Sequence, residues 1–188
     1  MTPFVPAVAP LSRRNIESDA VSIISRYYPK LLREPGRFPV LNFFDHVLRD
    51  EYGLDPGVEP LSDGVEGMTW PDGRVLVNEE TYCGADNGFG RPRFTVVHEC
   101  YHGIKHRDQI RKALIDTGEL VLYRRDDIKP YVDPEWQANT FASAVLMPEQ
   151  MVRRVIAGKQ RRLMANSLVE VFAVSLTAAE VRLKKLDI

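Results

Sequence analysis

The chain has 188 residues, of which 44% are hydrophobic and 27% are charged, and this composition is typical of one globular domain with a sizeable core. Its formal net charge of −1 excludes a global electrostatic field that would attract nucleic acid or an anionic membrane surface. The cysteines, Cys83 and Cys100, are too few for a disulfide framework and indicate a reducing compartment.

The first twelve residues are interrupted by Pro3, Pro6 and Pro10, and this spacing predicts a flexible, extended N-terminal tail at residues 1–12. The first ten residues contain no Lys or Arg, so they lack the basic start of a signal peptide. No apolar run in the sequence approaches the length of a membrane span. We therefore expect a cytoplasmic protein that has no membrane partner.

Two amphipathic helices are predicted after this tail. Apolar residues recur at helical spacing over residues 13–27, and Ser12 can cap this first helix. The second predicted helix spans residues 41–52 and ends at Gly53.

Between residues 54 and 80 the apolar period changes from helical to extended. Residues 65–70 alternate in polarity, residues 74–78 favour a strand, and Pro71-Asp72-Gly73 between them predicts a tight turn. Residues 57–61 can form another short strand. These segments predict a small antiparallel sheet, and residues 81–91 are expected to be a glycine-rich loop that leads to the next helix.

The most informative pattern is His98-Glu99-Cys100-Tyr101-His102, which has the form H-E-x-x-H and follows an apolar run. Residues four apart on a helix lie one turn apart on nearly the same face, so His98 and His102 can direct two imidazoles at one metal ion. Glu99 lies beside this pair, where its carboxylate can take a proton from an activated water and pass it to a leaving amine. The alternative is that the two histidines belong to an ordinary hydrogen-bonded core or surface.

Another helix that carries polar side chains is predicted to begin at Asp133, which can cap it. Glu135 and Asn139 lie one turn apart on one face of this helix. A mononuclear hydrolytic zinc ion typically has three protein ligands and one open position, and His98, His102 and Glu135 meet that count. Glu135 can instead be a simple helix-start carboxylate, and Asn139 can either hold a ligand by a hydrogen bond or pack the helix.

Three stretches of the sequence resemble the ImmA/IrrE family of zinc metallopeptidases. They are residues 93–102 followed by His106, residues 135–148, which are similar to the family's E-x-x-A-N-x-F-A-x-x-L-L-M-P block, and residues 172–186. The resemblance covers most of residues 13–188, and the first two stretches together are more specific than either one alone.

The resemblance implies an α+β fold of the zincin type, mainly helical, with the small antiparallel sheet before the metal-binding helix. It implies a gluzincin-like zinc metallopeptidase in which Zn²⁺ is held by His98, His102 and Glu135, with Glu99 as the catalytic base and acid. The implied substrate is a protein, such as a helix-turn-helix transcriptional repressor, whose cleavage relieves the repression of stress or mobile-element genes.

The sequence departs from the family pattern at Tyr101, because the residue before the second histidine is commonly glycine in the family. On the flank of the ligand face, a bulky ring would narrow the cleft. His106 is expected to support the site by hydrogen bonding, to pack or to cap the helix, because the ligand count is met without it. No single donor for the oxyanion stands out among the tyrosines, which include Tyr82, Tyr101, Tyr123 and Tyr131.

Residues 151–188 contain eight Lys or Arg against three Asp or Glu, whereas residues 124–127 are a mixed charge cluster expected to be solvated. Residues 168–183 are predicted to form two helices joined by a tight turn. A DNA-reading helix places base-contacting side chains near its start, but residues 176–179 are Leu, Thr, Ala and Ala. We therefore expect residues 164–188 to pack on a metallopeptidase domain at residues 13–163, without direct nucleic-acid binding.

The alternative function is a non-catalytic regulatory or DNA-binding module that keeps the zincin fold, and the basic C-terminal segment motivates it. Binding alone does not require Glu99, so the intact set of ligands and base argues against this alternative. DNA binding that weakens with salt would support it.

Overall fold

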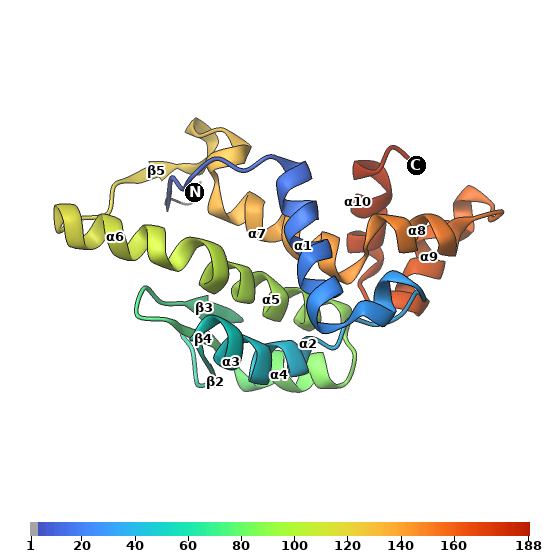
Figure 1. Cartoon of the computed structure of the whole chain (residues 1–188), viewed down its shortest axis with the longest axis horizontal. Helices are drawn as coiled ribbons and strands as arrows, with labels where there is room; N and C mark the ends of the chain where they lie inside the picture. The colour runs from blue at the N-terminus through green and yellow to red at the C-terminus, as the bar shows by residue number, and fades with distance from the viewer. Residues whose placement is uncertain (1–3) are drawn as a thin grey trace.

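Helix α5, Gly90–Tyr101, lies at the centre of the molecule and carries the first part of the H-E-x-x-H pattern (Figure 1). In the computed structural model, which describes residues 4–188, α5 continues through a π-helical turn, His102–His106, into α6, Arg107–Thr117. The three segments together form one long helical rod (Figure 1). Isolated π-helical turns inside helices occur frequently at functional sites, and this one begins at the second histidine of the pattern.

Two helices from opposite halves of the chain pack against each other beside α5. Helix α7, Pro134–Leu146, contacts α5 and also α1, Arg13–Tyr27. The predicted caps are confirmed, because Ser12 Oγ accepts a hydrogen bond from the backbone of Asn15 and Asp133 Oδ1 accepts one from the backbone of Glu135 at 2.9 Å. Most of α7 is buried, so the polar groups that it carries are held inside the protein.

The small sheet predicted before α5 is present and consists of β2, Asp55–Val58, β3, Gly67–Thr69, and β4, Arg74–Val77. Its strand order is β2-β4-β3, and the β3–β4 hairpin is antiparallel as expected. The pairing of β2 with β4 is parallel, because β3 runs opposite to β2, β4 reverses again after the hairpin, and β4 then lies between the two. The central strand β4 is buried, and β3 lies against α5.

The remaining helices close the core. The helix predicted at residues 41–52 is present, with a π-helical turn in its middle, whereas the loop expected at residues 81–91 is wrong because a helix occupies its first half. Asn78 caps that helix by accepting a hydrogen bond from the backbone of Thr81 at 2.8 Å. The helices that complete the fold are α2 (Val40–Asn42), the π-helical turn (Phe43–Val47), α3 (Leu48–Tyr52), α4 (Glu79–Asp86) and α8 (Glu149–Ile156). Short 3-10 turns span Pro29–Leu32, Arg125–Asp127 and Pro130–Val132.

The flexible tail predicted at residues 1–12 is wrong for residues 4–12, and residues 1–3 lie outside the described residues. Strand β1, Phe4–Pro6, pairs antiparallel with β5, Leu122–Arg124. The backbone N–H of Val8 donates to the carbonyl of Val132 at 3.0 Å, and Val8 is buried. An extended, proline-spaced segment is suited to pairing with a strand, but its partner lies far away in the sequence.

The C-terminal segment packs on the centre of the protein through α9, Arg161–Phe172, and α10, Leu176–Lys185. Its buried side chains join the main apolar core, and Arg93 of α5 donates from Nε to the carbonyl of Ala173 between the two helices at 3.0 Å. The predicted boundary between residues 163 and 164 falls inside α9. The break between helices lies earlier, at Gly158, whose φ of 72° ends the preceding helix.

Among residues 4–188, no helix taken alone has the length and apolar character needed to cross a membrane. Helices α9 and α10 reach that length and apolar character only when they are taken together, and the chain bends by 117° between them.

Replacing Gly90 with Ala is expected to lower the free energy of unfolding by roughly 1–3 kcal/mol. A Cβ atom at Gly90 would lie 2.2 Å from the backbone nitrogen of Ser175 and 2.3 Å from the carbonyl carbon of Val174, so one backbone must move. The measurement is urea unfolding followed by circular dichroism, with Gly36→Ala as the control because its nearest atom, Leu31 Cδ2, is 3.4 Å away. Equal stability of the two variants would contradict this close approach of α5 to the turn before α10.

Candidate metal centre and cleft

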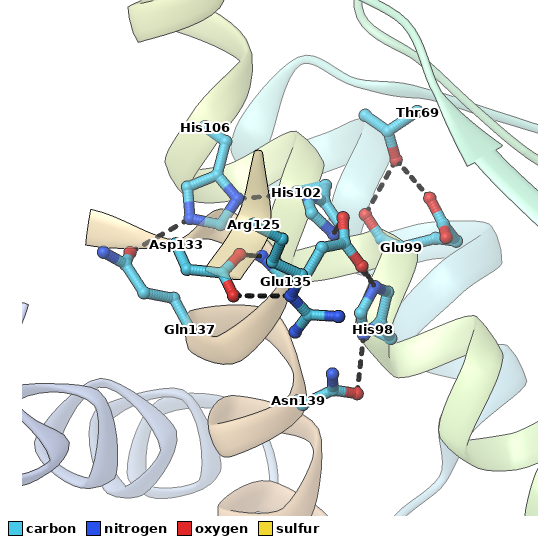
Figure 2. A network of polar contacts seen from close by, with 10 residues as sticks. All are labelled: Thr69, His98, Glu99, His102, His106, Arg125, Asp133, Glu135, Gln137 and Asn139. Atoms are coloured by element: carbon cyan, nitrogen blue, oxygen red, sulfur yellow. Dashed lines mark hydrogen bonds and ion pairs between the residues drawn. The ribbon is translucent and has the colours of Figure 1, made fainter. Parts of the chain in front are cut away.

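Three side chains from α5, the following π-helical turn and the start of α7 converge on one point (Figure 2). His98 Nε2 lies 3.2 Å from Glu135 Oε2, and His102 Nε2 lies 3.3 Å from Glu135 Oε1. The two Nε2 atoms are 2.9 Å apart. The structure therefore brings His98, His102 and Glu135 together as the sequence predicts, with one ligand-type atom from each side chain facing the others.

This donor set fits a small divalent ion. Zinc–nitrogen and zinc–oxygen bonds of about 2.0–2.1 Å at tetrahedral angles place neighbouring ligand atoms about 3.3 Å apart. The observed separations of 2.9 to 3.3 Å lie close to that spacing. Two imidazoles and a carboxylate that face one another at this distance repel through their lone pairs unless a proton or a cation lies between them.

The ionisation of the carboxylate is coupled to the two rings. Burial acts to raise the pKa of Glu135, but hydrogen bonds from His102 and His98 outweigh it and hold the pKa below its usual range. Burial acts to lower the pKa of His98, but the hydrogen bond and the charge of Glu135 outweigh it and the pKa is raised. Glu135 is thus held in its ionised form, and its charge favours a proton on the neighbouring imidazoles or, in its place, a metal cation.

Asn139 holds the ring of His98 from the side opposite the convergence. The amide oxygen Oδ1 of Asn139 lies 3.2 Å from His98 Nδ1 (Figure 2). Because an amide oxygen only accepts, His98 Nδ1 carries a proton and Nε2 keeps its lone pair for the ion. Of the two roles considered for Asn139, the geometry favours the support of a ligand over simple packing.

His106 does not point at the convergence, and it is completely buried. Its Nδ1 lies 3.0 Å from His102 Nδ1 and its Nε2 lies 3.1 Å from Gln137 Oε1. Burial, and next the neighbouring His102, lower the pKa of His106 to about 3, so the ring is neutral. His106 therefore contacts a ligand and is not one of the converging groups.

Glu99 lies beside the two histidines, and β3 determines where its carboxylate rests (Figure 2). The hydroxyl of Thr69 lies 2.9 Å from Glu99 Oε2 and 3.0 Å from the Glu99 carbonyl oxygen, and these two acceptors share its single hydrogen. A Cβ atom at Gly67 would lie 2.7 Å from Glu99 Cγ, so the glycine leaves the space that the side chain occupies. Sequence reasoning found Glu99 but missed Thr69 and Gly67, whose strand pattern contains no sign of this contact.

A cleft of about 970 Å³ opens onto the converging groups. One wall comes from β3 and the loop before it, the floor from α5 and α7, and the other wall from α10. Apolar groups, namely Phe94, Trp136, Ala178 and Val181, share the cleft with His98, Glu99 and Glu135. The C-terminal segment thus forms part of the cleft in addition to packing on the core.

The cleft-narrowing role expected for Tyr101 is wrong. Its side chain is fully buried, stacks on Phe141 with ring centroids 4.3 Å apart and donates its hydroxyl to Asp19 Oδ2 at 3.2 Å. The ring turns toward α1 and α7 because an apolar partner and a hydrogen-bond acceptor are available there. None of the four tyrosines considered as oxyanion donors is among the described residues that line the cleft.

Arg125 lines the cleft, although its sequence neighbourhood predicts only solvated charges. Its Nε donates to Asp133 Oδ2 at 2.7 Å, while Oδ1 of the same carboxylate caps α7 at the backbone of Glu135. Asp133 therefore holds both the guanidinium of Arg125 and the start of α7, the helix that carries Glu135. No local motif signals this placement, because the charge run itself is compatible with an exposed loop.

Comparison with known proteins extends these observations. The model of the Peptidase_M78 family, described as the IrrE N-terminal-like domain, matches residues 85–184. A comparison with curated protein sequences found no match. A solved structure of a Mycobacterium tuberculosis transcriptional regulator is similar, with 19% sequence identity and a TM-score of 0.60. The similarity covers 91% of this chain but only 46% of the regulator, and at this identity it shows the fold alone.

Proposed function

The chain belongs to the Peptidase_M78 family, and from this premise we propose that it is a zinc-dependent endopeptidase of the gluzincin type that acts in the cytoplasm. The observation that carries the proposal is the convergence of His98, His102 and Glu135 beside the carboxylate of Glu99, which is not one of the converging groups. The ligand-atom spacing supports zinc, and the open cleft next to the site supports access by a polypeptide.

Zinc at this site would supply Lewis-acid chemistry, polarising a substrate carbonyl and making a water molecule more acidic. Glu99 accepts the proton that this water loses and returns it to the amine nitrogen as the carbon–nitrogen bond breaks. Thr69 donates a hydrogen bond to Oε2, which orients the carboxylate and leaves Oε1 available for the proton. Asn139 and His106 keep the two imidazoles in place during these transfers.

The cleft supports a protein substrate bound as an extended segment between β3 and α10. Apolar side chains from α5, α7 and α10 line it, and they suit the side chains of a peptide better than a small polar metabolite. We propose a regulatory role in which the substrate is a helix-turn-helix repressor, with stress or mobile-element genes as the target of the regulation. The transcriptional regulator with a similar fold is compatible with such a setting.

The competing function is a regulatory or DNA-binding module without catalysis. Thr177 and Ala178, in the first turn of α10, line the same cleft as the converging groups, and residues 176–179 are poor in the side chains with which a recognition helix reads bases. This placement supports the peptidase and argues against direct reading of DNA.

The zinc-loaded protein is expected to cut a purified helix-turn-helix repressor encoded beside its own gene at a defined bond. The fragments are identified by mass spectrometry, and a chelator should stop the reaction because it removes the ion. A protein that holds zinc and leaves the repressor intact would contradict the proposed substrate. If that same protein binds DNA with an affinity that falls steeply with salt, the competing function is favoured.

A further inference from the structure

A continuous chain of hydrogen bonds leads from the candidate ligand His102 to the N-terminal segment of the protein, and Figure 2 shows its part from His102 to Gln137. His102 Nδ1 contacts His106 Nδ1 at 3.0 Å, and His106 Nε2 contacts Gln137 Oε1 at 3.1 Å. The side-chain nitrogen of Gln137 then donates to the carbonyl of Ala9 at 3.0 Å and to the carbonyl of Tyr131 at 2.8 Å. His106 and Gln137 are fully buried, so water does not compete for these bonds.

The donors and acceptors along this chain of hydrogen bonds can be assigned in only one way. Backbone carbonyls only accept, so two of them at Ala9 and Tyr131 fix the amide nitrogen of Gln137 and turn its oxygen toward His106. That oxygen also only accepts, so His106 carries its proton on Nε2 and presents the lone pair of Nδ1. His102 must therefore donate from Nδ1, which leaves the lone pair of its Nε2 facing Glu135 and His98.

We propose that His106 and Gln137 are positioning residues that set the tautomer and the orientation of the zinc ligand His102. This proposal rests on the function proposed above, because it needs an ion at the convergence. The usual partner of a metal-ligating histidine is a carboxylate, a backbone carbonyl or water, whereas here it is a second, neutral imidazole. The N-terminal segment completes the chain, since the carbonyl of Ala9 holds the amide of Gln137.

The packing around His106 favours this role over a purely structural one. The π-helical turn His102–His106 brings the two rings to a centroid distance of 4.9 Å with planes at 65°, so the edge of one ring meets the other. Tyr101 meets His106 with a centroid distance of 5.5 Å and planes at 89°. An apolar side chain would fill the same space without accepting the proton of His102 Nδ1.

The test compares zinc affinity among variants of the full-length protein by competition with a chromophoric chelator. His106→Phe removes the acceptor and is expected to weaken zinc binding roughly 10–100-fold, whereas His106→Asn restores an acceptor oxygen and should recover part of the loss. Gln137→Met releases the tautomer of His106 and should weaken binding less than His106→Phe. His46→Phe is the matched control, because His46 is exposed and lies outside the chain of bonds.

Nitrogen-15 NMR of the histidine rings supplies a readout that a structural role would not move. The wild-type protein is expected to carry the proton of His106 on Nε2, and Gln137→Met should lose this single tautomer. A proton on Nδ1 of His106, or zinc affinity of His106→Phe and Gln137→Met equal to that of His46→Phe, would overturn the proposal. If His106→Phe does not fold, Gln137→Met and the NMR spectrum of the wild type still decide the matter.

The two proposals fail in different ways. A wild-type protein that binds zinc but cleaves nothing contradicts the peptidase function and leaves the affinity comparison intact. A wild-type protein that binds no zinc contradicts the proposed function and, with it, the proposed ligand-positioning role, whatever the tautomer of His106.

Discussion

Replacing Glu99 with Gln is expected to abolish cleavage of the protein substrate while zinc remains bound. The side chain lies outside the three converging ligand atoms, so the substitution does not change the ligand count. Gln keeps the size of the side chain and an oxygen that can accept from Thr69, but it has no basic carboxylate to take the proton from water. General acid–base groups contribute on the order of 10²–10⁴ to the rate, so the loss should be at least that large.

The comparison uses zinc content, melting temperature and cleavage rate measured on the same preparations. Glu80→Gln is the control, because Glu80 is an exposed carboxylate of α4. It should match the wild type in all three quantities. If Glu99→Gln cleaves as fast as the wild type, the proton transfer assigned to Glu99 is wrong and the regulatory or DNA-binding module becomes the better account.

Replacing His102 with Ala is expected to remove zinc and activity together. His102 supplies one of the three converging atoms, and a site with only two protein ligands holds a divalent ion poorly. The change also removes the donor to His106, so the chain of bonds toward Gln137 loses its first member. Zinc content after dialysis against a weak chelator and the cleavage rate measure the result.

His46→Ala is the matched control for a lost imidazole at an exposed position. The pair of substitutions separates the two roles in the site, because Glu99→Gln should uncouple metal from activity and His102→Ala should not. Zinc retained by His102→Ala with the affinity of the wild type would show that the ion lies elsewhere.

The local patterns of the sequence predicted the parts of the site that lie within one helix. The spacing of His98 and His102 places both rings on one face, because the helical period alone decides which side chains share a side. The helix caps at Ser12 and Asp133 and the β3–β4 turn were predictable for the same reason, since each depends on residues within a few positions.

The positions of Glu135 and Asn139 were only partly predictable from local sequence. The start of their helix was readable, but nothing in the spacing placed it against α5. Asn139 meets His98 from 41 positions away, and this contact depends on how α7 packs against the rod and α1. The resemblance to a known family supplied the expectation for Glu135, and the structure supplied the distances.

By itself, then, the sequence determined the helix that presents His98, Glu99 and His102, because hydrogen bonds within four residues and the apolar period decide it. Only the tertiary structure decided that the N-terminal segment pairs with β5, that α10 forms a wall of the cleft and that Gln137 reaches Ala9, 128 positions away. These contacts join segments that have no common period, and they form only where burial of the whole core brings the backbones together.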